Sequence, residues 1–176
     1  MSTAIILVLF LVASAAVQGL LPVVTWLGQA PFPLLLSAVL YYALHRGAGV
    51  ALAAGFLAGL LQDALSPTHL GFSSLCFCAV GWGANRFRSL VIADSPLTPA
   101  FFGLVAGTLV TLALYLLGVR GDVVAYPWGR VALKSLGQGV TALISTPIVF
   151  GLLRLSDTLV GNVRTHEDIA EIDWSI

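Results

Sequence analysis

The chain has 176 residues, of which 59% are hydrophobic and 9% charged, and its formal net charge is zero. Soluble domains carry about 25% charged residues, so this composition excludes an ordinary water-soluble globule. A neutral chain offers no basic surface for nucleic acid, and we expect no nucleic-acid partner. The composition is typical of an all-α polytopic membrane protein whose outer surface faces lipid.

Apolar segments follow one another along the chain, and most approach the roughly 20 residues that a membrane-crossing helix needs. The six predicted spans are 4–24, 32–45, 47–64, 70–88, 98–119 and 131–154. We expect the first to be retained rather than cleaved as a signal peptide, since no Lys or Arg precedes it. The second is short, so it could start earlier, near Trp26, or run as a tilted or partly re-entrant segment. The sequence thus predicts a six-helix domain, 1–154, and a polar, acidic tail, 155–176.

The basic residues of the short loops predict the orientation, because Lys and Arg accumulate on the cytoplasmic side. With the N-terminus in the cytoplasm, the bias favours the cytoplasm for both termini and for the tail. The inside residues are then Arg46, Arg86, Arg88, Arg154 and Arg164, and the outside ones are Arg120 and Arg130, with Lys134 just within the sixth span.

Small residues recur every four positions in the third span, at Gly47, Ala51, Gly55 and Gly59. On a helix they form one smooth stripe, against which another backbone can pack closely. The stripe is either an interface for a partner protein or a packing surface inside this bundle. Gly103 and Gly107 form a second, shorter instance.

Two further features are candidate polar sites. Asp63 ends the third span, and a carboxylate at membrane depth is costly enough to suggest a function. It could instead be hydrated near the outer interface, or pair with His69 or with donors on the next helix. In the sixth span, four polar residues share one helix face, which could line a cavity, receive a partner helix or bond within the bundle. These residues are Lys134, Gln138, Thr141 and Ser145.

Gln18 in the first span and Thr108 and Thr111 in the fifth could meet this polar face. Lys134 alone can extend to the outer surface.

We find no pattern of a nucleophile with its base, so we expect no catalytic residue, no metal and no cofactor. Cys76 and Cys78 point to nearly opposite sides of a helix and are expected to be apolar filler.

One combined pattern runs through residues 31–83. It contains Pro33 followed by three leucines, an aromatic-rich span end at 40–44, the sequence Gly55-Phe-x-x-Gly59-x-x-x-Asp63, and then Leu70-Gly71. This pattern resembles the MreD family of bacterial rod-shape-determining membrane proteins. The chain departs from the family in having no basic residues before the first span, and its acidic tail has no counterpart that we can match.

The resemblance implies a protein that is not an enzyme. Members of the family act with MreC, with the MreB filament, and with a RodA-type glycosyltransferase and a class B penicillin-binding transpeptidase in peptidoglycan synthesis. They also look like the substrate-binding membrane subunit of energy-coupling-factor transporters, which implies a six-helix cup.

Our leading hypothesis is therefore a scaffold of the cell-elongation machinery in the bacterial cytoplasmic (inner) membrane. It would bind the single membrane helix of MreC along residues 47–59 and along exposed apolar faces of neighbouring spans. The alternative is a small-molecule-binding transporter subunit that uses the polar face around Gln138.

Overall fold

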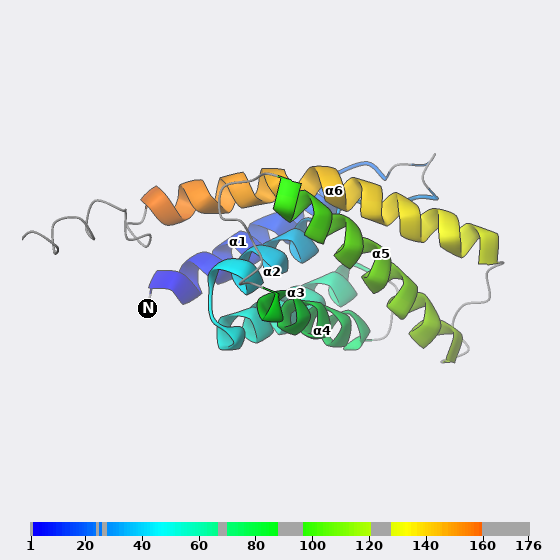
Figure 1. The fold of residues 1–176 in the computed structure, drawn as a ribbon, viewed down its shortest axis with the longest axis horizontal. Helices are drawn as coiled ribbons and strands as arrows, with labels where there is room; N and C mark the ends of the chain where they lie inside the picture. The colour runs from blue at the N-terminus through cyan, green and yellow to red at the C-terminus, as the bar shows by residue number, and fades with distance from the viewer. Residues whose placement is uncertain are drawn as a thin grey trace, which may run out of the picture.

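The computed structural model describes residues 2–23, 25, 28–66, 70–87, 97–120 and 128–159. These residues form helices without a strand among them, which confirms the predicted all-α class (Figure 1). The helices are α1 (Ser2–Leu20), α2 (Leu34–His45), α3 (Ala48–Leu65), α4 (Phe72–Arg86), α5 (Leu97–Arg120) and α6 (Trp128–Leu159). Each of them coincides with one predicted span. Residue 69 and the tail from residue 160, for which we made predictions, lie outside the described residues, as do Trp26, Arg88 and Arg164.

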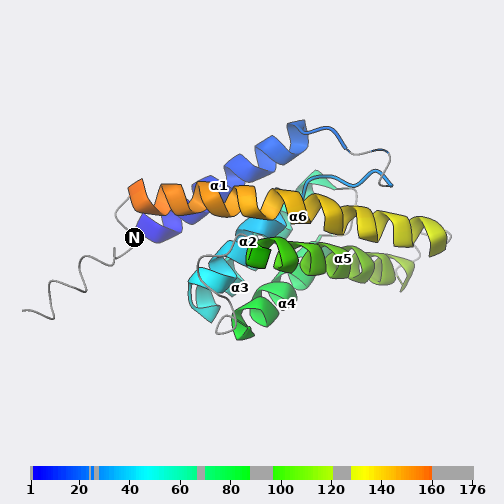
Figure 2. The same cartoon turned by 45° about the horizontal axis from the view of Figure 1, so that its top comes forward.

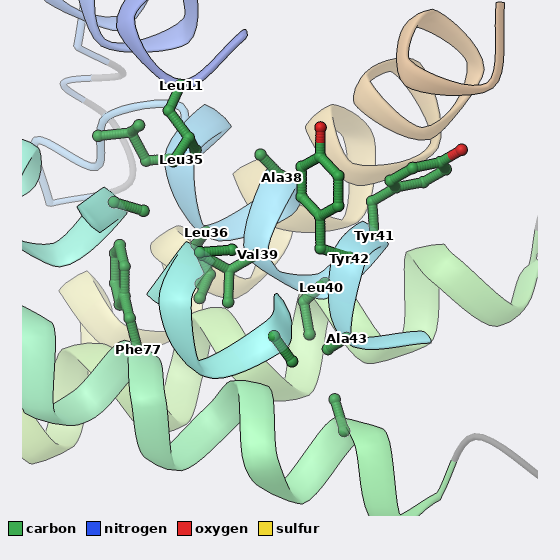
Figure 3. Close-up of a cluster of buried hydrophobic side chains, with 14 of the residues drawn as sticks. Leu11, Leu35, Leu36, Ala38, Val39, Leu40, Tyr41, Tyr42, Ala43 and Phe77 are labelled. Atoms are coloured by element: carbon green, nitrogen blue, oxygen red, sulfur yellow. The ribbon is translucent and has the colours of Figure 1, made fainter. Parts of the chain in front are cut away.

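Helix α2 occupies the centre of the bundle (Figure 2). Its sequence is apolar on almost every side, so the helix can lie either in lipid or inside the protein. Every residue from Leu35 to Leu44 is buried, and the helix packs against each of the other five. Figure 3 shows Leu11 of α1 and Phe77 of α4 among the side chains around it. The second predicted span is therefore an interior helix that starts at Leu34, well after Trp26.

The interior position explains why α2 can be short. Its 12 residues extend about 18 Å, which is less than the roughly 30 Å of a hydrocarbon core. A helix surrounded by protein has no need to match the thickness of the lipid. The flanking loops enter the bundle, where side chains of other helices can satisfy their backbone groups.

The outer surface is apolar. Three helical segments are long and apolar enough to cross a membrane, namely Ala48–Leu65, Leu97–Gly118 and Trp128–Thr158, and the stretches Leu7–Leu20 and Leu34–His45 are shorter. Large hydrophobic side chains lie exposed along α1, α5 and α6, for example Leu9, Phe101 and Leu136. So much exposed apolar surface would make a small protein aggregate in water, whereas it is favourable in contact with lipid.

One end of the bundle collects arginines, and we call it the arginine end. Arg46 follows α2, Arg86 ends α4 and Arg154 lies near the end of α6. The start of α1 and the end of α6 lie at this same end of the bundle (Figure 1). The opposite end carries Arg130 and Lys134 at the start of α6. The placement of the arginine end in the cytoplasm stays a prediction from the distribution of basic residues.

Helices α5 and α6 pack closely through glycines. A Cβ atom added at Gly107 would lie 2.9 Å from Ala142 Cβ and 2.9 Å from the Gln138 carbonyl oxygen. One added at Gly139 would lie 3.1 Å from the Leu104 carbonyl oxygen. The second small-residue instance, around Gly107, thus lies in a contact inside the bundle.

We expect Gly107→Val to destabilise the bundle by about 1–3 kcal/mol, because the added carbons overpack the contact between α5 and α6. The measurement is the apparent midpoint of thermal unfolding in detergent, followed by circular dichroism. Gly151→Val on α6 is the matched control, since a Cβ there meets nothing within 4 Å. Equal midpoints for the two variants would contradict this packing.

Candidate functional site

The small-residue stripe of α3 lies against α4. A Cβ built at Gly55 would be 3.0 Å from the Phe77 carbonyl oxygen, and one built at Gly59 would overlap the backbone of Ser74. Ala51 is fully buried, whereas a Cβ at Gly47 meets nothing within 4 Å. From position 51 to position 59 the stripe is therefore covered by a helix of the same chain. A partner helix cannot pack on this face while α4 occupies it.

Polar groups reinforce this close approach. The Ser74 hydroxyl donates a hydrogen bond to the Phe56 carbonyl oxygen, at 3.2 Å. The Cys78 thiol is 3.5 Å from the Leu52 carbonyl oxygen. Both contacts cross from α4 to backbone carbonyls of α3, and such contacts require two helices to lie very near each other.

Asp63 caps the N-terminus of α4. Its side chain is 3% exposed, and its two oxygens accept hydrogen bonds from the backbone N–H of Gly71 at 2.6 Å and of Ser73 at 3.2 Å. The first N–H groups of a helix have no partner within the helix and carry partial positive charge, so a carboxylate suits them. Gly71 adopts a φ of 102°, which a residue with a side chain rarely adopts.

The pattern Gly55–Gly59–Asp63–Gly71 is therefore one structural unit. The glycines of α3 let α4 approach, the carboxylate holds the start of α4, and Gly71 makes the turn between them. This geometry accounts for the spacing of the sequence motif without a ligand. Asp63 has a structural partner in the fold, and it is not left unpaired in the membrane.

The polar face of α6 makes hydrogen bonds with the start of α2 and with the residues just before it. Thr141 donates to the Pro31 carbonyl oxygen at 3.1 Å. The Ser37 hydroxyl lies 3.3 Å from that of Ser145 and 3.1 Å from that of Thr146. Thr141, Ser145 and Thr146 are all buried, so the face meets the chain's own residues here.

The outer part of that face is more open. Gln138 is half-buried, and Lys134 is exposed at the end opposite the arginine end. The backbone of Lys134 lies against the loop before α2, because a Cβ at Gly28 would be 3.1 Å from Lys134 Cα. Of the four predicted residues, Thr141 and Ser145 are therefore buried and hydrogen-bonded inside the bundle. Gln138 and Lys134 lie in the more open part of this face.

Our prediction that Gln18 could meet this face is wrong. The Gln18 amide donates to the Gln62 side chain at 2.8 Å and accepts from the Leu35 backbone N–H at 3.3 Å. It therefore links α1 to α3 and to the start of α2. The hydroxyls of Thr108 and Thr111 bond to carbonyl oxygens of their own helix, as threonines in apolar helices often do.

Sequence reasoning missed a polar cluster at the arginine end, formed by Tyr41, Arg46 and Asp157. The Tyr41 hydroxyl donates to Asp157 Oδ2 at 2.8 Å, and Arg46 Nη2 lies 3.3 Å from the same oxygen. Asp157 is 3% exposed. A buried carboxylate with a cation and a hydroxyl donor is well compensated, and losing one partner leaves the other charge unpaired.

Aromatic rings and an amide complete this cluster. The Tyr41 ring stacks on His45, with centroids 4.4 Å apart, and meets the Phe150 ring edge-on. Asn85 of α4 donates to the carbonyl oxygens of Ala43, at 2.7 Å, and of Arg46, at 3.0 Å. The C-terminal end of α2 is therefore held by side chains of both α4 and α6.

A sequence signal for Asp157 existed. Phe150, Leu153 and Asp157 are spaced by three and four residues, so a continuous helix places them on one face. Leu153 is fully buried, and Asp157 follows it into the bundle. The predicted sixth span ends at 154 and so leaves Asp157 in the polar tail, whereas α6 runs on to Leu159.

Comparison with known proteins identifies a family. The family model described as rod shape-determining protein MreD matches residues 1–156. No curated protein and no solved structure matches the chain. The expected likeness to the energy-coupling-factor transporter subunit thus stays a prediction.

We expect Asp63→Leu to destabilise the protein by about 1–3 kcal/mol, because it leaves buried N–H groups at the start of α4 without an acceptor. Asp63→Asn, which keeps one acceptor oxygen, should lose less. The measurement is again the apparent unfolding midpoint in detergent. If both variants were as stable as the parent chain, the capping role of Asp63 would be wrong.

We expect Asp157→Ala to cost about 3 kcal/mol, because Arg46 and Tyr41 then lose a shared acceptor in a buried setting. Thr158→Ala is the neighbouring control, since its hydroxyl bonds only to the Arg154 carbonyl oxygen of its own helix. A double-mutant cycle of Arg46→Gln and Asp157→Asn measures the coupling energy. Additive losses would show that the ion pair contributes nothing.

Proposed function

Because the chain belongs to the MreD family, we propose that it is a non-enzymatic membrane scaffold of the bacterial cell-elongation machinery and binds MreC. The observation that carries the proposal is the match over residues 1–156, which includes every predicted span. A role in rod-shape determination follows from the family. Binding to the membrane helix of MreC is the specific activity that we propose.

The proposed assembly also contains MreB, a RodA-type glycosyltransferase and a class B penicillin-binding transpeptidase. In this proposal the protein lies in the inner membrane, with both termini and the arginine end in the cytoplasm. That placement would put Arg46, Arg86 and Arg154 on the side where basic residues accumulate. The protein would then contribute to peptidoglycan synthesis by positioning its partners.

The structure changes where we expect the MreC helix to bind. Because α4 covers the stripe from Ala51 to Gly59, we propose the neighbouring helix α1 instead. Within the described residues α1 packs only against α2 and α3. Its outer face is exposed and apolar and carries small residues in the middle, which allow a second helix to come close. This face comprises Leu9, Ala13, Ala16 and Leu20.

The alternative, a small-molecule-binding transporter subunit, gains no support from the described residues. Its expected site was the polar face around Gln138. Thr141 and Ser145 of that face bond to residues before and within α2, and α2 itself fills the centre of the bundle.

We expect Ala16→Phe to reduce recovery of MreC by affinity purification from native membranes several-fold. The bulky ring would hold a partner helix away from α1, yet it points outward and leaves the bundle packed. Ala132→Phe on an exposed position of α6 is the control.

The two arms of this experiment distinguish the proposed interface on α1 from the proposed binding of MreC. Undiminished recovery with Ala16→Phe, at normal protein levels, would reject α1 as the interface. Absence of MreC from preparations of the unmodified protein would reject the proposed function itself.

A further inference from the structure

An apolar groove runs between α4 and α5, which lie side by side (Figure 1). Its volume is about 730 Å³, within the range of small-molecule sites. It extends along α4 from Leu75 to Ala84, reaches Phe87 just after this helix, and extends along α5 from Phe102 to Leu117, with Leu40 of α2 as part of its floor. None of its lining residues is charged or carries a hydroxyl group. The chemistry of the groove therefore favours a hydrocarbon chain.

The length of the groove matches one leaflet of a bilayer. Twelve residue steps along α4 correspond to about 18 Å. Half of a hydrocarbon core measures about 15 Å. One acyl chain that runs from the headgroup level to the middle of the membrane therefore fits along the groove.

One end of the groove has a basic residue. Phe87 lines the groove, and Arg86 beside it is exposed. Trp82, one helical turn earlier, is also exposed, and tryptophan side chains favour the headgroup level. Helix α4 has 15 residues and extends about 22 Å, so in a bilayer Arg86 at its end would lie near the boundary between headgroups and hydrocarbon.

The charge of Arg86 has no protein carboxylate to pair with among the described residues. These residues include two carboxylates, Asp63 and Asp157. Asp63 caps the far end of α4, and Asp157 is bound by Tyr41 and Arg46. A guanidinium at the mouth of an apolar groove complements a phosphate at the head of a hydrocarbon chain.

We propose that the groove between α4 and α5 binds an anionic phospholipid, with an acyl chain along Leu75–Phe87 and its phosphate on Arg86. The lipid would fill the gap between the two helices and complete the packing beside α2. This inference goes beyond the proposed scaffold role and can be tested on the isolated protein.

The test uses the full chain in detergent, titrated with phosphatidylglycerol or phosphatidylcholine of identical chains and followed by native mass spectrometry. We expect tighter binding of phosphatidylglycerol. Arg86→Gln should weaken it about fivefold, as expected for one basic residue at a membrane surface, and Arg86→Lys should restore most of it. Arg130→Gln, at the opposite end, is the charge control.

The chain site is tested by Gly83→Leu. Gly83 lines the groove, and a Cβ there meets nothing within 4 Å, so the new side chain fits into the groove without repacking. It removes on the order of ten carbon–carbon contacts of the lipid, and we expect about tenfold weaker binding of both lipids. Gly151→Leu is the control, since a Cβ there is equally unhindered.

Three outcomes would overturn the proposal. Equal affinity of the unmodified protein for the two lipids would remove the role of Arg86. Unchanged lipid binding by Gly83→Leu would exclude the groove as the chain site. Loss of MreC recovery with Gly83→Leu, at unchanged lipid binding, would show that the groove accepts a protein helix instead.

Discussion

The burial of α2 is the constraint on which the rest of the bundle depends. This apolar helix contacts all five other helices, and the polar groups at its buried ends need partners inside the protein. In its first turn, the Leu35 N–H donates a hydrogen bond to Gln18 of α1, and the Ser37 hydroxyl bonds to the hydroxyl of Thr146 on α6. Its last turn receives Asn85 from α4 and, through Tyr41 and Arg46, Asp157 from α6. Two groups of buried polar side chains thus lie where the central helix begins and ends.

Most of the polar and small residues that the sequence analysis identified as candidate sites hold the helices of the bundle together. The glycines of α3 and Asp63 form a tight hairpin with α4, and Thr141 and Ser145 hold the segment that leads into α2. The surfaces left for lipid and partners are then plain apolar faces, such as that of α1, and the groove beside α5. The proposed scaffold role needs this division, because a rigid interior lets the outer faces keep a fixed shape.

The sequence predicted the number and class of the helices well, since long apolar runs in lipid can only be helical. It did not reveal which spans touch lipid, because hydropathy is equally high for α1 and for the interior α2. It did not decide whether the Gly55–Gly59 stripe packs against a partner protein or inside the bundle, because a smooth helix surface suits both. It missed the pairing of Arg46 with Asp157, because these residues are far apart in the chain and one lay in the assumed tail. Only the spacing of Phe150, Leu153 and Asp157 carried that information.

The attachments of α2 have a consequence for biosynthesis. Residues 34–45 are synthesised before Asn85 and Asp157, which hold the end of this helix. Until then the newly inserted segment has no enclosing neighbours on the side of α6, and it is too short to span the lipid on its own. The central helix is thus synthesised before α6, one of the helices that enclose it, so insertion of the chain and completion of its interior are separate events.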